Sequence, residues 1–179
     1  MATKHDDERT WKHKNRPYIY AAALALILTM FVAPEIQEGD AMSPTIDNGN
    51  LVVITKERYS VKRGLPEIGT VVILQKDEAT EISEDNLIAR VVGLPGETIT
   101  INEGQLFRDG KKYVVKETQG NLGEDMEVKL GKEEVFLLCD NRDVQMDSRS
   151  AKLGPIDMEV IRGNVRFVLW PFSEIGGVE

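Results

Sequence analysis

The stretch Glu38–Ile46 reads EGDAMSPTI, and it decides how the rest of the chain is understood. Gly39 and Asp40 form a turn-like approach that could present the side chain of the next residue. Two later stretches are considered with it. Ile88–Glu97 (IARVVGLPGE) is an apolar run that ends in turn residues, and Cys139–Arg149 (CDNRDVQMDSR) is a polar, charged stretch that follows the short apolar run Val135–Leu138.

The three stretches resemble sequence boxes of the type I signal peptidases, membrane-bound serine–lysine proteases that remove signal peptides from exported proteins. In that family the first box reads roughly Gly-x-Ser-Met-x-Pro-Thr, and its Ser is the nucleophile; that position is Ala41 here. The second box reads roughly Lys-Arg-x-x-Gly-x-Pro-Gly-Asp, and its Lys is the general base; that position is Ala89 here. In the third box a Ser orients the lysine amine, and that position is Gln145. The resemblance runs from Tyr18 to Glu174 and implies the family scaffold without its reacting groups. It also implies that Ala41, Ala89 and Gln145 converge at one apolar groove.

The resemblance also implies roles for neighbouring residues. Residues expected to brace the site are Asp140, Asp147, Ser148 and Arg149. Residues expected to line the substrate groove are Met42, Pro44, Leu87 and Ile88. From its charges alone the third stretch would be a solvated turn, but its matched spacing favours a site. Cys139 is expected to be a small buried apolar residue rather than a reactive thiol.

Composition excludes several other classes of function. The chain has 179 residues and a net charge of −8, so nucleic acid is not an expected partner. Its single cysteine, Cys139, allows no internal disulfide. Both histidines, His5 and His13, lie near the N-terminus, so the rest of the chain can form neither a Ser-His-Asp triad nor a His-containing metal site. We expect no metal and no cofactor.

An uncharged segment, Tyr18–Ala33, follows a polar tail of residues 1–17 that carries five basic and three acidic residues. At about 1.5 Å per residue the segment would span roughly 24 Å as a helix, slightly less than a bilayer core. We expect residues 18–34 to form a single-pass transmembrane anchor in contact with membrane lipid, starting at Pro17. The basic residues predict a cytoplasmic N-terminus and an extracytoplasmic domain, residues 35–179, at the cell membrane. A buried core helix and a cleavable secretory signal are the alternatives.

The remainder of the chain predicts a mainly β, antiparallel body of the signal peptidase type. β-branched or alternating runs that predict strands are Leu51–Thr55, Val71–Leu74, Leu87–Val92, Thr98–Ile101, Val135–Leu138 and Arg166–Pro171. Asp109-Gly110 predicts a hairpin between residues 106 and 115. Gln119–Gly131 is weakly patterned and predicts an exposed loop or small cap, and the acidic run Asp77–Asn86 predicts a loop.

A serine–lysine hydrolase needs a hydroxyl nucleophile, an unprotonated amine and donors for the oxyanion. The apolar neighbours Leu87 and Ile88 could desolvate an amine at position 89, but Ala89 carries only a methyl group. The main-chain N–H of Ala41 remains as an oxyanion-type donor. Ser43 is the nearest hydroxyl and shares a face with position 41 in an extended segment, but it has no evident base.

The residues therefore predict a chain that does not cleave peptides. One interpretation is a natural, inactive homologue that binds a peptide or a pilin subunit by strand addition, as an assembly factor. The alternative is a signal peptidase that cleaves exported preproteins after small-x-small sequences, with engineered alanines at positions 41 and 89. The changed positions 139, 144 and 145 favour the first interpretation, since a relaxed requirement for chemistry would let the supporting box drift.

Overall fold

The structure is a computed structural model that describes residues 4–75, 87–115 and 118–178. It divides into two compact units, residues 1–33 and residues 34–179, which are described separately. The predicted loop Asp77–Asn86 lies outside the described residues.

The first unit consists mainly of α1 (Lys4–Phe31). The prediction that this helix begins at Pro17 is wrong, because Pro17 lies inside it. A proline within a helix leaves one main-chain hydrogen bond unmade, but the apolar residues that follow favour a continuous helix. In the part of the chain that the structure describes, no helix has the length and apolarity needed to cross a membrane.

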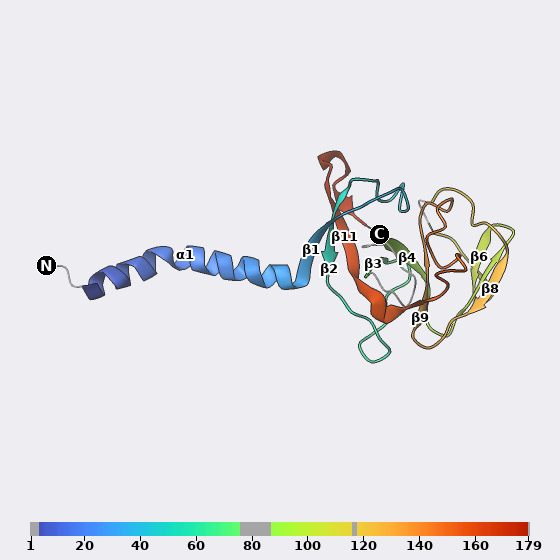
Figure 1. Ribbon diagram of the computed structural model, residues 1–179, viewed down its shortest axis with the longest axis horizontal. Helices are drawn as coiled ribbons and strands as arrows, with labels where there is room; N and C mark the ends of the chain where they lie inside the picture. The colour runs from blue at the N-terminus through green and yellow to red at the C-terminus, as the bar shows by residue number, and fades with distance from the viewer. Residues whose placement is uncertain (1–3, 76–86, 116–117, 179) are drawn as a thin grey trace. The chain divides into compact units, whose positions relative to one another are not determined.

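The second unit is an antiparallel β body built from two sheets, which agrees with the predicted fold class (Figure 1). Neighbouring strands of the larger sheet are, in order, β1 (Val32–Ile36), β2 (Leu51–Thr55), β11 (Ile161–Trp170), β3 (Val71–Leu74), β4 (Ile88–Gly93), β9 (Glu134–Leu138) and β10 (Ile156–Asp157). β12 (Gly176–Gly177) pairs with β11. The smaller sheet has the order β7 (Lys111–Tyr113), β6 (Gln105–Arg108), β5 (Thr98–Asn102) and β8 (Met126–Lys129). Two short 3₁₀ helices, Met158–Val160 and Phe172–Glu174, flank β11.

The strands that were predicted are present with shifts of one or two residues at their ends, except that β11 starts five residues earlier, at Ile161. Gln119–Gly131 was predicted to be a loop or small cap. This prediction is wrong for its residues 126–129, which form β8 and pair antiparallel with β5. The sequence MEVK of β8 alternates only weakly, and its pairing with a distant strand decides its conformation. In Figure 1 the smaller sheet lies at the far side of the body from β2 and β11.

The central strands β3 and β4 are buried on both faces of the larger sheet. Because side chains alternate along a strand, Val72 and Ala89 pack into one apolar cluster, while Ile73 and Ile88 pack into another on the opposite face. A third cluster, which includes Phe136, fills the space against the smaller sheet. The middle of β4 is therefore a rigid support for the residues next to position 89.

Candidate functional site

The Arg90 guanidinium joins three of the sequence stretches inside the body. Its Nε donates to Oδ1 of Asp140 at 2.8 Å and its Nη2 to Oδ2 of Asp140 at 2.6 Å. Oδ2 of Asp140 also accepts the Thr45 hydroxyl at 2.6 Å. The remaining nitrogen, Nη1, donates to the Gly69 carbonyl at 2.7 Å. Both charged side chains are almost entirely buried, so the first, second and third stretches are fixed to one another by a paired, hydrogen-bonded charge.

The main chain at position 41 is held directly by the third stretch. The Asn141 N–H donates to the Ala41 carbonyl at 3.0 Å. The Asn141 side-chain amide donates to the Asp40 carbonyl at 3.1 Å. Ala41 sits in a turn after Gly39, whose φ of +74° is a conformation that glycine adopts most easily. Two separate hydrogen bonds thus position the main chain around Ala41, the residue predicted to occupy the nucleophile position.

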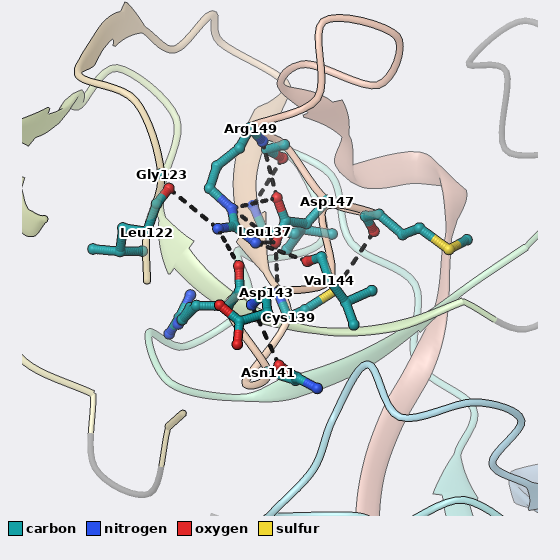
Figure 2. Close-up of polar contacts among 12 residues, drawn as sticks. Leu122, Gly123, Leu137, Cys139, Asn141, Asp143, Val144, Asp147 and Arg149 are labelled. Carbon is teal, nitrogen blue, oxygen red and sulfur yellow. Dashed lines mark hydrogen bonds and ion pairs between the residues drawn. The ribbon is translucent and has the colours of Figure 1, made fainter. Parts of the chain in front are cut away.

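Arg149 organises the remainder of the third stretch (Figure 2). Its guanidinium donates to the Asp147 carboxylate at 2.8 to 3.2 Å and to the carbonyls of Arg142 at 2.7 Å and Val144 at 2.8 Å. A longer contact of 3.2 Å reaches the Leu122 carbonyl, in the segment before β8. Planar, multi-donor recognition of this kind is a property of arginine that lysine lacks.

Asp147 and Ser148 also bind β9, the strand beside β4. The Cys139 N–H donates to Asp147 Oδ2 at 2.9 Å, and the Leu137 N–H donates to the Ser148 hydroxyl at 3.0 Å. Both side chains are buried. Of the four residues expected to brace the site, Asp140, Asp147 and Ser148 are buried and hydrogen-bonded, and Arg149 is half-buried with hydrogen bonds to Asp147.

A groove of about 920 Å³ lies beside Ala41. It is lined by Pro34, Glu35, Ile36, Gln37, Glu38, Gly39, Asp40, Ala41, Leu51, Leu87, Ile88, Val144 and Met146. The groove was predicted to be apolar, but its lining also contains four polar or acidic side chains.

The residues predicted for the site occupy different positions relative to this groove. Ala41, Leu87 and Ile88 line it. Ala89 does not; it is fully buried in the cluster that also contains Leu87, with Met146 packed against it. Position 89 therefore lies behind the groove wall, in the same apolar cluster as Leu87 and Met146, which both line the groove.

Three further predicted residues are not among the groove-lining residues. Met42 is fully buried in the cluster with Ile88, because the turn directs it into the core. Pro44 is exposed. Gln145 is exposed too, and its amide nitrogen lies near Gly123, 3.4 Å from where a Cβ at that glycine would stand. The neighbours of Gln145 in sequence, positions 144 and 146, line the groove instead.

The groove lining supplies no group for serine–lysine chemistry. Among its described residues there is no Ser, Thr, Cys, Lys or His. The Ser43 hydroxyl points elsewhere and donates to the Asp47 carboxylate at 2.7 Å. Within the same described ranges, no group of three or more His, Cys, Asp or Glu side chains is placed to hold a metal ion.

Two buried groups behind the site have shifted pKa values. Burial raises the pKa of the Cys139 thiol to about 12, and the nearby Asp147 carboxylate acts in the same direction. The thiol is therefore neutral and unreactive near pH 7. Burial lowers the pKa of Arg142, and the carboxylates of Asp140 and Asp147 oppose that change.

Sequence reasoning did not assign roles to Arg90, Thr45, Asn141 or Gln37. The first three lie within the quoted stretches, and Arg90, a charged residue inside an otherwise apolar strand, was a signal of a buried ion pair. No comparable signal marks Gln37, because its importance depends on a groove that only the fold creates.

The chain is similar to known signal peptidases. The family model described as signal peptidase, peptidase S26, matches residues 11–170. A signal peptidase I of Bacillus amyloliquefaciens is 32% identical over 191 residues, covering 96% of this chain and 95% of its own. A probable signal peptidase I-1 of Synechocystis sp. is 31% identical over 173 residues, covering 91% of this chain and 85% of its own.

A crystal structure of a signal peptidase I from Enterococcus faecalis aligns with 60% of this chain and 98% of its own, with a TM-score of 0.47 and 17% identity. The matched family model and the two sequence relatives cover nearly the whole chain, including all three stretches. The chain belongs to the signal peptidase family, peptidase S26.

Proposed function

We propose that this chain is a non-catalytic member of the signal peptidase I family that binds extended peptide segments of exported proteins. The observation that carries the proposal is the contrast at the site. The Arg90–Asp140–Thr45 network and the groove are intact, whereas Ala41 and Ala89 offer neither a nucleophile nor a base. Removing members of a catalytic unit leaves binding as the remaining capacity of the site.

The position of the groove in the sheet supports binding of an extended peptide. One wall is the segment from Pro34 to Ala41, which continues from β1. β1 is the edge strand of the larger sheet, and an edge strand has main-chain N–H and C=O groups that can pair with an added strand. The apolar residues Leu87 and Ile88 form the opposite contact for the peptide's side chains.

Exported preproteins are the first candidate partners, because the family acts on them. Pilin subunits are a second class of partner for a non-catalytic homologue. The residues Val144 and Gln145 of the third stretch favour such a homologue, because a supporting box that no longer serves catalysis is free to drift. A signal peptidase inactivated by engineered alanines is the alternative origin of this sequence. The codons of the source gene at positions 41 and 89 distinguish an engineered pair from a natural one.

We also propose that the uncharged segment Tyr18–Ala33 attaches the chain to the cell membrane in a single pass, with the β body outside. Support comes from the helical conformation of most of this segment and from the exposed large apolar side chains on it, among them Leu26 and Met30. Protease added to intact spheroplasts is expected to digest the body; full protection of the body would refute this topology.

Titration of the full chain with a labelled preprotein-derived peptide tests the binding function. We expect saturable binding and recovery of the intact peptide. Val144→Trp, which fills the groove, is expected to weaken binding. Val61→Trp is the matched control, because Val61 is exposed and does not line the groove. Equal binding by both variants, or none by the unmodified chain, would contradict the proposal.

A further inference from the structure

Gln37, a residue of the groove lining, has an unsatisfied acceptor. Only 3% of the residue is exposed. Its Oε1 is shielded from solvent and finds no hydrogen-bond partner among the residues that the structure describes. A buried acceptor without a donor is costly, so the native structures of proteins seldom retain one without a reason.

The orientation of the Gln37 amide is fixed by its other end. Nε2 donates to the Glu38 carbonyl at 2.9 Å and to the Gly39 carbonyl at 3.3 Å. Exchanging the two amide atoms would place Oε1 against two carbonyl oxygens, which repel it. The main chain of Gln37 is held as well, since its N–H donates to the Asn50 carbonyl at 2.9 Å. The unpartnered atom is therefore the oxygen, and it requires a donor.

The charge around this acceptor is negative. Glu38 and Asp40 line the same groove and are exposed. Glu35 lines it too, but Arg162 pairs with that carboxylate at 3.1 Å. Among the groove-lining residues that the structure describes there is no Lys, Arg or His. A ligand with a positive charge and several N–H donors complements both features.

We propose that the groove selects extended peptides that place a lysine side chain beside Gln37, with the ammonium group donating to Oε1 and facing the carboxylates of Glu38 and Asp40. This inference rests on the proposed peptide-binding function and adds the chemistry that the groove recognises. An ammonium group carries three donors on a compact charge, which suits one amide oxygen and two carboxylates. Oε1 is shielded in the free chain, so binding includes a local adjustment of the groove wall.

The test uses three peptides of one extended sequence that carry Lys, Ala or Glu at a single central position. Their dissociation constants are measured by fluorescence anisotropy with the full chain at low and high salt. Since a hydrogen bond to a charged group contributes enough for about a tenfold change in affinity, we expect the Lys peptide to bind about tenfold more tightly than the Ala peptide. The Glu peptide is expected to bind most weakly. Higher salt should reduce the difference, because exposed charges are screened.

Variants assign the preference to Gln37. Gln37→Leu removes the acceptor and is expected to bring the Lys and Ala peptides close to equal affinity, while Gln37→Glu should increase the Lys preference. Gln105→Leu is the matched control, because Gln105 is an exposed glutamine that does not line the groove. Thermal unfolding of each variant shows whether it is folded. If Gln37→Leu does not fold, the Lys preference is measured in other variants. It should increase in Gln37→Glu, and it should decrease in Glu38→Gln and in Asp40→Asn, which remove the carboxylate charges.

The possible outcomes separate this inference from the function on which it rests. Binding of the Ala peptide as tightly as the Lys peptide overturns the lysine preference and leaves peptide binding in place. Failure of all three peptides to bind contradicts the proposed function itself. A Lys preference that persists unchanged in Gln37→Leu but disappears in Glu38→Gln assigns recognition to the carboxylates and overturns the role of Gln37.

Discussion

Arg90 and Asp140 form a two-point ion pair, with 2.8 Å between Nε and Oδ1 and 2.6 Å between Nη2 and Oδ2. Arg90 immediately follows Ala89, and Asp140 lies next to Asn141, whose N–H donates to the carbonyl of Ala41. The pair therefore links the strand that contains position 89 to the turn that contains position 41. Under the proposed function, this link keeps the shape of the site although Ala41 and Ala89 supply no reacting group.

Breaking this ion pair should destabilise the body strongly. Arg90→Met leaves the Asp140 carboxylate buried without its charged partner, and we expect a loss of about 3–5 kcal/mol in the free energy of unfolding. The double variant Arg90→Met/Asp140→Leu should lose less than the single one, since no buried charge remains. Urea unfolding of both measures this. Arg166→Met, in the exposed pair with Glu57, is the control and should cost at most about 1 kcal/mol.

Arg149 should not tolerate a conservative replacement. In Arg149→Lys a single ammonium cannot reach the Asp147 carboxylate and the carbonyls of Arg142 and Val144 together, so several buried acceptors lose their donor. We expect a loss of about 2–4 kcal/mol in stability and faster amide hydrogen exchange over residues 140–149. Arg63→Lys, at an exposed position, should change neither quantity. Normal protection of residues 140–149 in Arg149→Lys would show that this network does not hold the loop.

Stability should fall at alkaline pH because of Cys139. Burial raises the pKa of its thiol to about 12 in the folded chain, well above the ordinary value of a free thiol. The folded state therefore keeps the proton that the unfolded state loses. The stabilisation is complete below about pH 9 and is lost as the pH rises toward 12, by up to about 1.4 kcal/mol per pH unit. Urea unfolding between pH 8 and 11 is expected to show a smaller decline for Cys139→Ala than for the unmodified chain. Identical slopes would contradict the raised pKa.

Restoring both reacting groups should restore some cleavage. Ala41→Ser alone lacks a base and Ala89→Lys alone lacks a nucleophile, so each should process a membrane-anchored preprotein no better than the unmodified chain. In the double variant the apolar cluster around position 89 would desolvate the amine and favour its neutral form. We expect cleavage after a small-x-small sequence, detected by mass spectrometry of the product.

The base-orienting position is tested by adding Gln145→Ser to that double variant. An increase in the rate supports the position predicted from the third box. No change would place residue 145 outside the site, consistent with the proximity of its side chain to Gly123. Thermal unfolding checks that the buried lysine has not unfolded the body, because a lysine in an apolar cluster costs stability.

The sequence predicted the β body and most of its strands because their apolar runs are long or alternating, as in Leu51–Thr55. It missed β8, because the strand that pairs with β8 lies far away in sequence. It also missed that α1 continues on both sides of Pro17, because a proline normally starts or ends a helix. Ala41, Leu87 and Ile88, which only the resemblance to a family singled out, line one groove, and their roles there stay predictions. The polar character of the groove could not be predicted, since Gln37 and Asp40 acquire meaning only when the fold brings Leu87 and Val144 opposite them.

We propose that this chain keeps the groove of a signal peptidase but does not cleave peptides. The most direct measurement is mass spectrometry of a membrane-anchored preprotein, with a small-x-small sequence before its mature part, after prolonged incubation with the unmodified chain. The same incubation with Ser43→Ala serves as the control. We expect to recover the intact preprotein from both samples. Multiple turnovers by the unmodified chain that disappear with Ser43→Ala would contradict it and identify the Ser43 hydroxyl as a working nucleophile.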